Sequence, residues 1–136
     1  MISTKGRYAL RLMVDISLNQ SAGSVALRDV AERQELSQKY LESISVLLSR
    51  AGLLISQRGK QGGYRLSRPA SEINIAEVIC AAEGGISPVA CAEVGAGGCE
   101  RACTCPTLPV WKKLDKLIED YLSGITIEDL AKGNLE

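Results

Sequence analysis

The sequence SQKYLESISVLLSRAG, at residues 37–52, carries the clearest helical pattern in the chain, and the predicted fold is built around it. Ser37 is a favourable N-cap, and apolar residues recur after it at the spacing of a helix. The predicted buried side consists of Leu41, Ile44, Leu47, Leu48 and Ala51. Gly52 ends the segment, since glycine readily adopts the backbone conformation that follows a helix. The stretch therefore predicts one amphipathic helix from about residue 38 to residue 51.

Two further helices are predicted upstream of this one. Thr4 is the expected N-cap of a helix over residues 5–19, and residues 28–34 predict a short second helix with Val30 and Ala31 facing inward. The buried side of the first helix is predicted to consist of Tyr8, Ala9, Leu12, Met13 and Ile16. Only Glu35 and Leu36 separate the second helix from residue 37. Two short helices joined by such a turn, behind an upstream helix, are typical of a helix-turn-helix.

A basic hairpin is predicted downstream. Residues 54–58 read as a strand, residues 59–63 as a flexible glycine-rich tip, and residues 64–66 as a returning strand before Pro69. Three helices followed by such a hairpin are typical of a winged helix, whose third helix enters the major groove of DNA. Taken alone, the third helix is better explained as a surface helix of an ordinary helical bundle, and Gly62-Gly63 as an ordinary hairpin turn. Their order and their charge together favour the winged helix.

The charges are distributed unevenly along the chain, although the formal net charge is zero. Residues 1–68 carry eleven Lys and Arg against five Asp and Glu, and residues 69–136 carry five against eleven. A basic N-terminal half attracts a phosphate backbone, which indicates nucleic acid docking there. The alternative is a solvated surface on which like charges happen to be grouped.

Three polar residues of the third helix are predicted to meet base edges. Gln38 can pair with adenine, Lys39 with guanine, and Glu42 can accept a hydrogen bond from cytosine. A carboxylate near phosphates is repelled unless it meets a donor, so Glu42 is either a specificity filter or a solvated charge. We favour the filter. Arg58 and Lys60 at the hairpin tip supply positive charge beside them.

The sequence CAEVGAGGCERACTC, at residues 91–105, is here called the cysteine segment. It contains Cys91, Cys99, Cys103 and Cys105 among Gly, Ala and charged residues, without an apolar periodicity, so a ligand-holding loop is predicted. The chain has no histidine and no Cys-x2-Cys pair, which excludes mixed Cys/His zinc sites and ferredoxin-type spacing. An iron-sulfur cluster, a four-thiolate zinc site and a redox thiol pair remain open. Cys80, in a helix predicted over residues 76–83, is expected to be a buried thiol and no ligand.

A coiled-coil-like seam follows the cysteine segment. Val110, Leu114, Leu117 and Tyr121 recur at intervals of four, three and four residues among charged neighbours. The seam predicts either a helix that folds back on its own core or a dimerisation helix, and we favour the dimer because helix-turn-helix proteins commonly bind DNA as twofold dimers. A brief last helix is predicted after Thr126.

Length and composition limit the possible locations and classes. A chain of 136 residues with 46% hydrophobic content can bury one compact domain with an arm. No window approaches the apolar run of about 18 residues that a membrane span needs, and the N-terminus has no apolar signal region. Five cysteines, an odd number, favour reduced thiols, so a cytoplasmic protein is expected. An enzyme is not expected, since no histidine base, phosphate loop or paired-carboxylate motif is present.

Four motifs resemble those of the winged-helix regulators typified by IscR, the iron-sulfur cluster regulator. These are STKGRYA at residues 3–9, YLE at residues 40–42, the wing glycines with Arg58 and Tyr64, and three cysteines ahead of Trp111. The resemblance covers nearly the whole chain. It implies a [2Fe-2S] cluster held by three cysteines and one further ligand, and repression of the cluster-assembly operon. By position, the three cysteines are Cys91, Cys99 and Cys105.

The sequence departs from this family at the fourth cluster ligand. The family's histidine falls on Leu108, which cannot bind iron. Cys103 is predicted to replace it, and Glu93, Glu100 or a group from a partner chain are the alternatives. The resemblance also implies that Glu42 separates two classes of DNA site. The predicted DNA-contacting residues are Thr4, Lys5, Ser37, Gln38, Lys39, Tyr40, Glu42, Arg58, Gly59 and Lys60.

The sequence thus predicts a mainly α chain, a winged helix-turn-helix with a C-terminal dimerisation helix. The predicted parts are a DNA-binding domain at residues 1–85, a cluster-binding loop at 86–106, and a dimerisation helix and tail at 107–136. The predicted function is a cluster-sensing transcription repressor that binds double-stranded DNA as a homodimer, with no membrane and no small-molecule substrate. The alternatives are a winged-helix regulator with a zinc or thiol switch, and a small iron-sulfur electron carrier.

Overall fold

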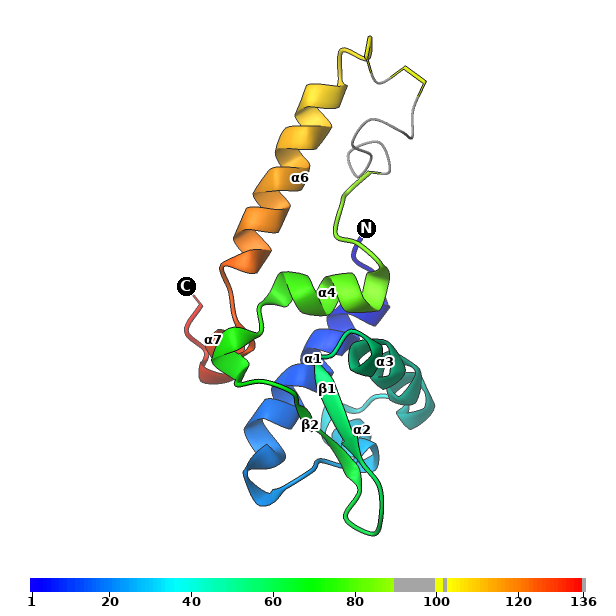
Figure 1. The fold of residues 1–136 in the computed structure, drawn as a ribbon, viewed down its shortest axis with the longest axis vertical. Helices are drawn as coiled ribbons and strands as arrows, with labels where there is room; N and C mark the ends of the chain where they lie inside the picture. Colours follow the sequence, from blue (N-terminus) through cyan, green and yellow to red (C-terminus); the bar gives the residue numbers. More distant parts are fainter. Residues whose placement is uncertain (90–99, 102, 136) are drawn as a thin grey trace.

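The computed structural model describes residues 1–89, 100–101 and 103–135, and its elements follow the predicted order (Figure 1). The mainly helical winged-helix prediction is confirmed. The elements are α1 (Thr4–Asn19), the 3₁₀ turn η1 (Gln20–Ala22), α2 (Leu27–Gln34), α3 (Gln38–Arg50), β1 (Leu54–Gln57), β2 (Gly63–Leu66), the 3₁₀ turn η2 (Ala70–Glu72), α4 (Ile75–Glu83), α6 (Leu108–Ser123) and α7 (Ile127–Lys132). Within the described ranges, no helix combines the length and apolar character that a membrane crossing requires.

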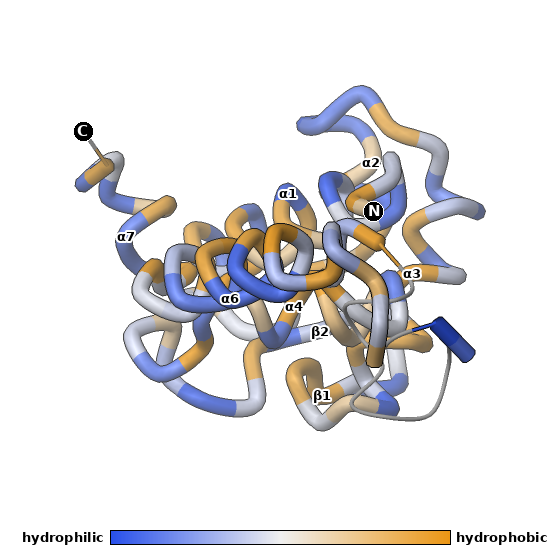
Figure 2. Tube along the Cα trace, turned by 90° about the horizontal axis from the view of Figure 1, so that it is seen from above, coloured by the Kyte–Doolittle hydropathy of each residue, from blue (hydrophilic) through white to orange (hydrophobic). Residues whose placement is uncertain are grey.

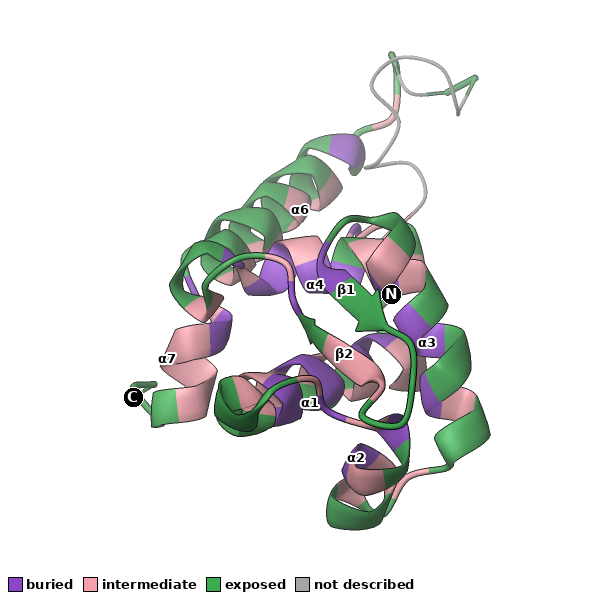
Figure 3. Ribbon diagram, turned by 60° about the horizontal axis from the view of Figure 1, so that its bottom comes forward, coloured by how far each residue is buried: buried purple, intermediate pink, exposed green. Residues whose placement is uncertain are grey.

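The hydrophobic core surrounds α1, which contacts α2, α3, α4 and α7. Its fully buried side chains include Leu12, Met13, Ile16, Val30, Leu41, Ile44, Leu48, Ile73, Val78 and Ile127 (Figure 3). The predicted buried side of α3 is partly wrong, because Leu47 is only half-buried and Ala51 is exposed. Ser45 is fully buried instead. Residues 41, 44, 45 and 48 form one side of the helix, and this side packs under the wing and against α1.

The wing is a two-stranded antiparallel hairpin that pairs Leu54 with Leu66 and Gln57 with Gly63. Val25, just before α2, forms a bridge to Tyr64, with both N–H···O distances at 2.8 Å. A Cβ atom on Gly63 would overlap the carbonyl oxygen of Val25. Glycine at this position therefore lets the wing lie directly against the segment that leads into the helix-turn-helix.

The chain leaves this core after α4 and returns to it after α6. The Ile75 amide donates to the Ile125 carbonyl, and the Ile127 amide donates to the Ile73 carbonyl, each at 2.9 Å. α7 then packs on α1 with Ile127 fully buried. Between these anchors α6 extends away from the body as an arm (Figure 1), and seen from above it carries hydrophobic and hydrophilic residues in alternation (Figure 2).

Candidate DNA-binding surface and cysteine segment

The first two turns of α3 present polar side chains to solvent. The Ser37 hydroxyl accepts a hydrogen bond from the Tyr40 amide at 3.2 Å and so caps the helix as predicted. Gln38, Lys39 and Glu42 are all exposed. The side-chain amide of Gln38 donates to the Glu42 carboxylate at 3.4 Å, so the two candidate base-reading groups lie side by side. Both are available to a ligand outside the protein.

The wing tip is exposed, and the strand that follows it contacts α3. Arg58, Gly59 and Lys60 are exposed, and the Gly62 amide donates to the Gly59 carbonyl at 3.0 Å to close the turn. Gly59 has a φ of +114°, a backbone conformation that favours glycine. One residue pair away from the tip end of the hairpin, the Tyr64 hydroxyl lies 3.2 Å from the Ser45 hydroxyl of α3. This contact links the basic tip and the candidate recognition helix.

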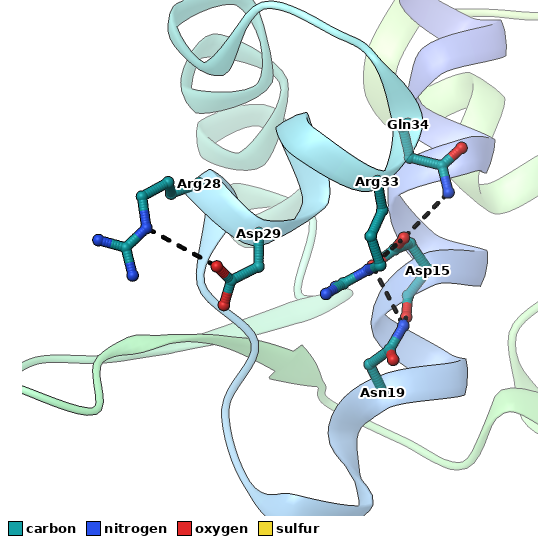
Figure 4. Close-up of polar contacts among 6 residues, drawn as sticks. All are labelled: Asp15, Asn19, Arg28, Asp29, Arg33 and Gln34. Atoms are coloured by element: carbon teal, nitrogen blue, oxygen red, sulfur yellow. Dashed lines mark hydrogen bonds and ion pairs between the residues drawn. The ribbon is translucent and has the colours of Figure 1, made fainter.

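A buried carboxylate joins α1 to α2. Asp15 is 3% exposed and accepts hydrogen bonds from the Arg33 guanidinium, with the shortest at 2.6 Å, and from the side-chain amide of Gln34 at 2.9 Å (Figure 4). The hydrogen bond with Asp15 is the main cause that raises the pKa of Arg33 above its ordinary value. Sequence reasoning missed this group. The available signal was an acidic residue beside Ile16, within the predicted buried stripe.

An aromatic pair connects the start of α1 to the start of α3. The rings of Tyr8 and Tyr40 meet edge to face, with centroids 5.8 Å apart and an interplanar angle of 81°. The Arg11 guanidinium carbon lies 5.5 Å from the Tyr8 ring centroid. Such contacts stabilise one relative placement of the two rings. They bring the opening motif and the YLE motif of the sequence together.

The predicted N-cap of α1 is wrong by one residue. The Ser3 hydroxyl accepts from the Lys5 amide at 3.1 Å, whereas Thr4 is already the first residue of the helix. Serine and threonine are both good caps, so the sequence alone did not separate them. Thr4 and Lys5, the predicted DNA contacts in this turn, are half-buried.

The cysteine segment is described only in part. Cys91 and Cys99 lie outside the described residues, Cys103 is exposed and Cys105 is half-buried. The Cys105 sulfur lies 3.2 Å from the Thr107 hydroxyl, next to the start of α6. This contact, followed by hydrogen bonding with the Thr107 and Leu108 amides, lowers the pKa of the Cys105 thiol. The lowered pKa favours the thiolate form of Cys105, which is the form that binds metals.

Two further positions bear on ligation. Leu108, the first residue of α6, is buried, so a buried apolar side chain occupies the position of the family's histidine.

Cys80, predicted to be buried, is exposed, and this prediction was wrong. The buried side of α4 is formed by Ile75, Ala76, Val78, Ile79 and Ala82. Residue 80 lies on the other side and lines an open cleft of about 490 Å³ between α4 and α6. In the described part of the chain, no three His, Cys, Asp or Glu side chains form a group suited to a metal.

The profile of the Rrf2 family, described as an iron-dependent transcriptional regulator, matches residues 2–133. The chain belongs to the Rrf2 family. IscR of Escherichia coli O1:K1 / APEC is 40% identical to this Rrf2 regulator over 130 residues, which are 96% of this chain and 79% of the relative. The resemblance to IscR-type regulators stated from sequence is thereby confirmed.

Solved structures agree with this membership. IscR of T. potens matches with a TM-score of 0.77 and 35% identity over 99% of this chain and 88% of that one. The oxidised form of Staphylococcus aureus CymR matches with a TM-score of 0.75 and 34% identity over 96% and 95%. This Rrf2 protein is a helix-turn-helix transcriptional regulator, and proteins of its family bind DNA. Its relatives are transcriptional regulators, a class without enzymatic activity.

Proposed function

We propose that this Rrf2 regulator is a cytoplasmic homodimeric repressor that senses an iron-sulfur cluster and controls genes for cluster assembly. The observation that carries the DNA-reading part is the arrangement around α3. The exposed Gln38, Lys39 and Glu42 share a helix with Ser45, whose hydroxyl meets the wing at Tyr64. A helix in the major groove and a basic tip on neighbouring phosphates can then act as one unit.

The contacts divide into two kinds. Gln38, Lys39 and Glu42 are proposed to read base edges, and Ser37, Tyr40, Arg58, Gly59, Lys60, Thr4 and Lys5 are proposed to hold the DNA backbone or frame the surface. Lys39→Ala and Lys60→Ala are expected to weaken promoter binding. Lys60→Ala is expected to weaken all sequences about equally and to lower the salt dependence, since phosphate contacts carry no sequence information. Electrophoretic mobility shifts at several salt concentrations measure both effects.

Glu42 is proposed to restrict the choice of site. Its exposed carboxylate already accepts from Gln38, and a base edge without a donor would leave it facing negative phosphates. Glu42→Ala is expected to let the cluster-free protein bind the class of promoter that it otherwise disfavours. Equal binding of wild type and variant to both classes would contradict this role.

Two copies of the chain are proposed to pair through α6. Val110, Leu114, Leu117 and Tyr121 are 59%, 38%, 52% and 67% exposed, and they form one side of the helix. An apolar surface lined by Pro109, Val110, Lys113, Leu114 and Leu117 follows the same side. A second α6 would cover these residues and set the distance between two recognition helices.

The donor set supports a cluster rather than a mixed zinc site. Cys91, Cys99, Cys105 and Cys103 are the proposed ligands, and thiolate is the donor that iron-sulfur clusters prefer. The lowered pKa of Cys105 and the exposure of Cys103 suit both for ligation. Leu108 has a hydrocarbon side chain and offers no donor at the position of the family's histidine. A bound [2Fe-2S] cluster would supply sensitivity to iron and oxidants.

Anaerobic reconstitution with iron and sulfide tests this proposal. We expect the visible absorption of a [2Fe-2S] cluster in the wild type, and its loss or change in Cys91→Ala, Cys99→Ala, Cys103→Ala and Cys105→Ala. Cys80→Ala is the matched control, because residue 80 lies on α4 outside the cysteine segment. Iron-free, colourless wild-type protein after reconstitution would contradict the proposal.

A thiol switch without metal is the second candidate. The favourable thiolate form of Cys105 and the similarity to an oxidised CymR structure support it. It predicts that mild oxidation changes DNA affinity in metal-free protein and that Cys105→Ala removes this response. Metal analysis of anaerobically purified protein separates this candidate and a four-thiolate zinc site from the cluster.

A further inference from the structure

The last residue of α4 caps the first turn of α1. A carboxylate oxygen of Glu83 accepts hydrogen bonds from the amides of Ser3, at 2.7 Å, and Gly6, at 2.8 Å, and also from the Ser3 hydroxyl. Amides in the first turn of a helix have no partner within the helix. Burial by itself raises the pKa of Glu83, but the hydrogen bonds from Ser3 and Gly6 outweigh burial and keep the pKa below its ordinary value.

The packing around this contact leaves little freedom. A Cβ atom on Gly6 would lie 2.8 Å from the Glu83 carboxylate oxygen and 3.1 Å from its Cγ. Glycine is therefore needed for the carboxylate to reach the Gly6 amide. A second contact lies close by, where the Met1 amino group donates to the Ser87 carbonyl at 3.3 Å. The end of α4 therefore contacts the first turn of α1, and Ser87, four residues further along, contacts the residue three positions before α1 begins.

The start of α1 also contacts α3, through Tyr8. Tyr8 follows Gly6 by two residues, and its ring meets Tyr40 in the first turn of the recognition helix. The Tyr40 amide in turn donates to the Ser37 cap. A shift of the first turn of α1 would therefore move the surface on which Tyr40 rests. Rigid helices linked by packed side chains can carry such a shift.

We propose that Glu83 is a positioning residue that transmits the state of the cysteine segment to the recognition helix. Cys91 follows Glu83 by eight residues, so a ligand held by that cysteine would act on the chain close to the carboxylate. The relay runs from Glu83 to Ser3 and Gly6, and then through Tyr8 to Tyr40. This inference rests on the proposed cluster-sensing function.

A purely structural cap makes a different prediction from a relay. Loss of a cap destabilises the cluster-free and cluster-loaded proteins alike and leaves the ratio of their DNA affinities unchanged. Loss of a relay changes that ratio, which is the coupling between the two sites. The ratio is therefore the decisive measurement.

The experiment compares the full-length wild type with Glu83→Ala and Gly6→Ala, which break the same contact from its two sides. Each protein is prepared cluster-free and reconstituted, and its dissociation constant is measured for both promoter classes. Where the wild-type ratio lies in the typical range of about 5- to 150-fold, we expect both variants to fall within about twofold of unity. Cluster absorption is expected to remain at the wild-type level.

Two controls make the result specific. Glu83→Gln keeps an oxygen that can accept from Ser3 and Gly6, so it is expected to retain most of the ratio. Glu72→Ala removes an exposed glutamate of η2 and is expected to retain the full wild-type ratio of DNA affinities.

Tyr8→Leu tests the step of the relay from α1 to α3. Combined with Glu83→Ala, it should lower the ratio no further than Glu83→Ala alone, because both substitutions interrupt one route.

The outcomes separate the relay from the function on which it rests. A wild-type ratio of one would overturn the proposed sensing function. A wild-type ratio well above one that persists in Glu83→Ala and Gly6→Ala would overturn the relay alone. Loss of the ratio in both variants, with normal cluster loading and retention in Glu83→Gln, supports the relay.

Discussion

The winged-helix core and the α6 arm use similar apolar residues but bury them differently. Ile44 and Leu48 of the core are fully buried, whereas Leu117 and Tyr121 of the arm are 52% and 67% exposed. Removal of apolar surface from water stabilises by about 25 cal/mol per Å². The core therefore gains its stability within one chain, whereas the apolar side of the arm remains exposed to solvent in the single chain.

The ion pairs show the same difference. In the core, Arg33 meets an Asp15 side chain that is 3% exposed, and the contact is 2.6 Å long. On the arm, Lys116 and Asp120 are 2.8 Å apart, but both side chains are more than half exposed. Exposed pairs are worth only about 0–1 kcal/mol because solvent screens them. The buried ion pair between Arg33 and Asp15 therefore helps to hold α2 against α1, whereas the exposed pair between Lys116 and Asp120 contributes little to stability.

The largest effect on unfolding is expected from a cavity in the core. Ile44→Ala should lower the free energy of unfolding by about 2–5 kcal/mol, because packed neighbours relax only partly into the space. Val46→Ala on the same helix is the control, since Val46 is 44% exposed, and it should change stability by about 0.5 kcal/mol or less. Urea denaturation followed by circular dichroism measures both. Equal losses of stability in the two variants would contradict the claim that the buried side of α3 carries the stability of the core.

A smaller effect is expected at the α1–α2 junction. Asp15→Ala should lower the free energy of unfolding by about 2 kcal/mol, because Arg33 and Gln34 lose their hydrogen-bond acceptor. Arg33 is partly exposed, so water can replace some of its lost hydrogen bonds. Asp29→Ala removes the acid of a more open pair with Arg28, at 3.7 Å, and serves as the control (Figure 4). A loss in Asp29→Ala as large as that in Asp15→Ala would contradict the argument.

Acid is expected to weaken the junction between α4 and α1. Burial raises the pKa of Glu83, but the hydrogen bonds from Ser3 and Gly6 and a smaller contribution from the charge of Lys5 outweigh it, so the pKa is lowered in the folded protein from an ordinary value of 4.5. The stabilisation is therefore complete above pH 4.5 and is lost as the pH falls through the lowered pKa. Wild type should exceed Glu83→Gln in stability at neutral pH, and the gap should close under acid. Urea titrations between pH 7 and pH 3 follow it, and a gap that is constant with pH would exclude this origin.

The smallest change in chain unfolding is expected on the arm. Leu117→Glu, measured at concentrations where the chain is monomeric, should alter the free energy of unfolding by about 0.5 kcal/mol or less. The dimer dissociation constant should nevertheless rise by about 100-fold, since the seam would have to bury an unpaired carboxylate.

Lys112→Gln, on the opposite side of α6, is the matched control and should leave dimerisation unchanged. Analytical ultracentrifugation measures the association of each variant. A large loss of monomer stability in Leu117→Glu would show that the arm folds against its own core.

Much of the fold could be predicted because local patterns and tertiary packing agree. The helical periodicity of residues 37–52, the cap at Ser37 and the basic hairpin identified a winged helix, and the boundaries differ from prediction by a residue or two. The errors arose where an element has more than one plausible buried side. Cys80 sits among apolar neighbours in sequence, yet α4 buries the side that carries Val78 and Ile79. Periodicity over nine residues is too short to choose that side.

The fold class, the basic N-terminal half and the candidate thiol ligands could be read from the sequence, because spacing, charge and side-chain chemistry are properties of the chain alone. Only the tertiary structure decided which distant groups meet. The reach of Glu83 to Ser3 and Gly6, the pairing of Asp15 with Arg33, and the contact of Tyr8 with Tyr40 join residues that no local pattern connects. Such contacts depend on how whole helices pack, and packing is settled by the shape and volume of the complete core.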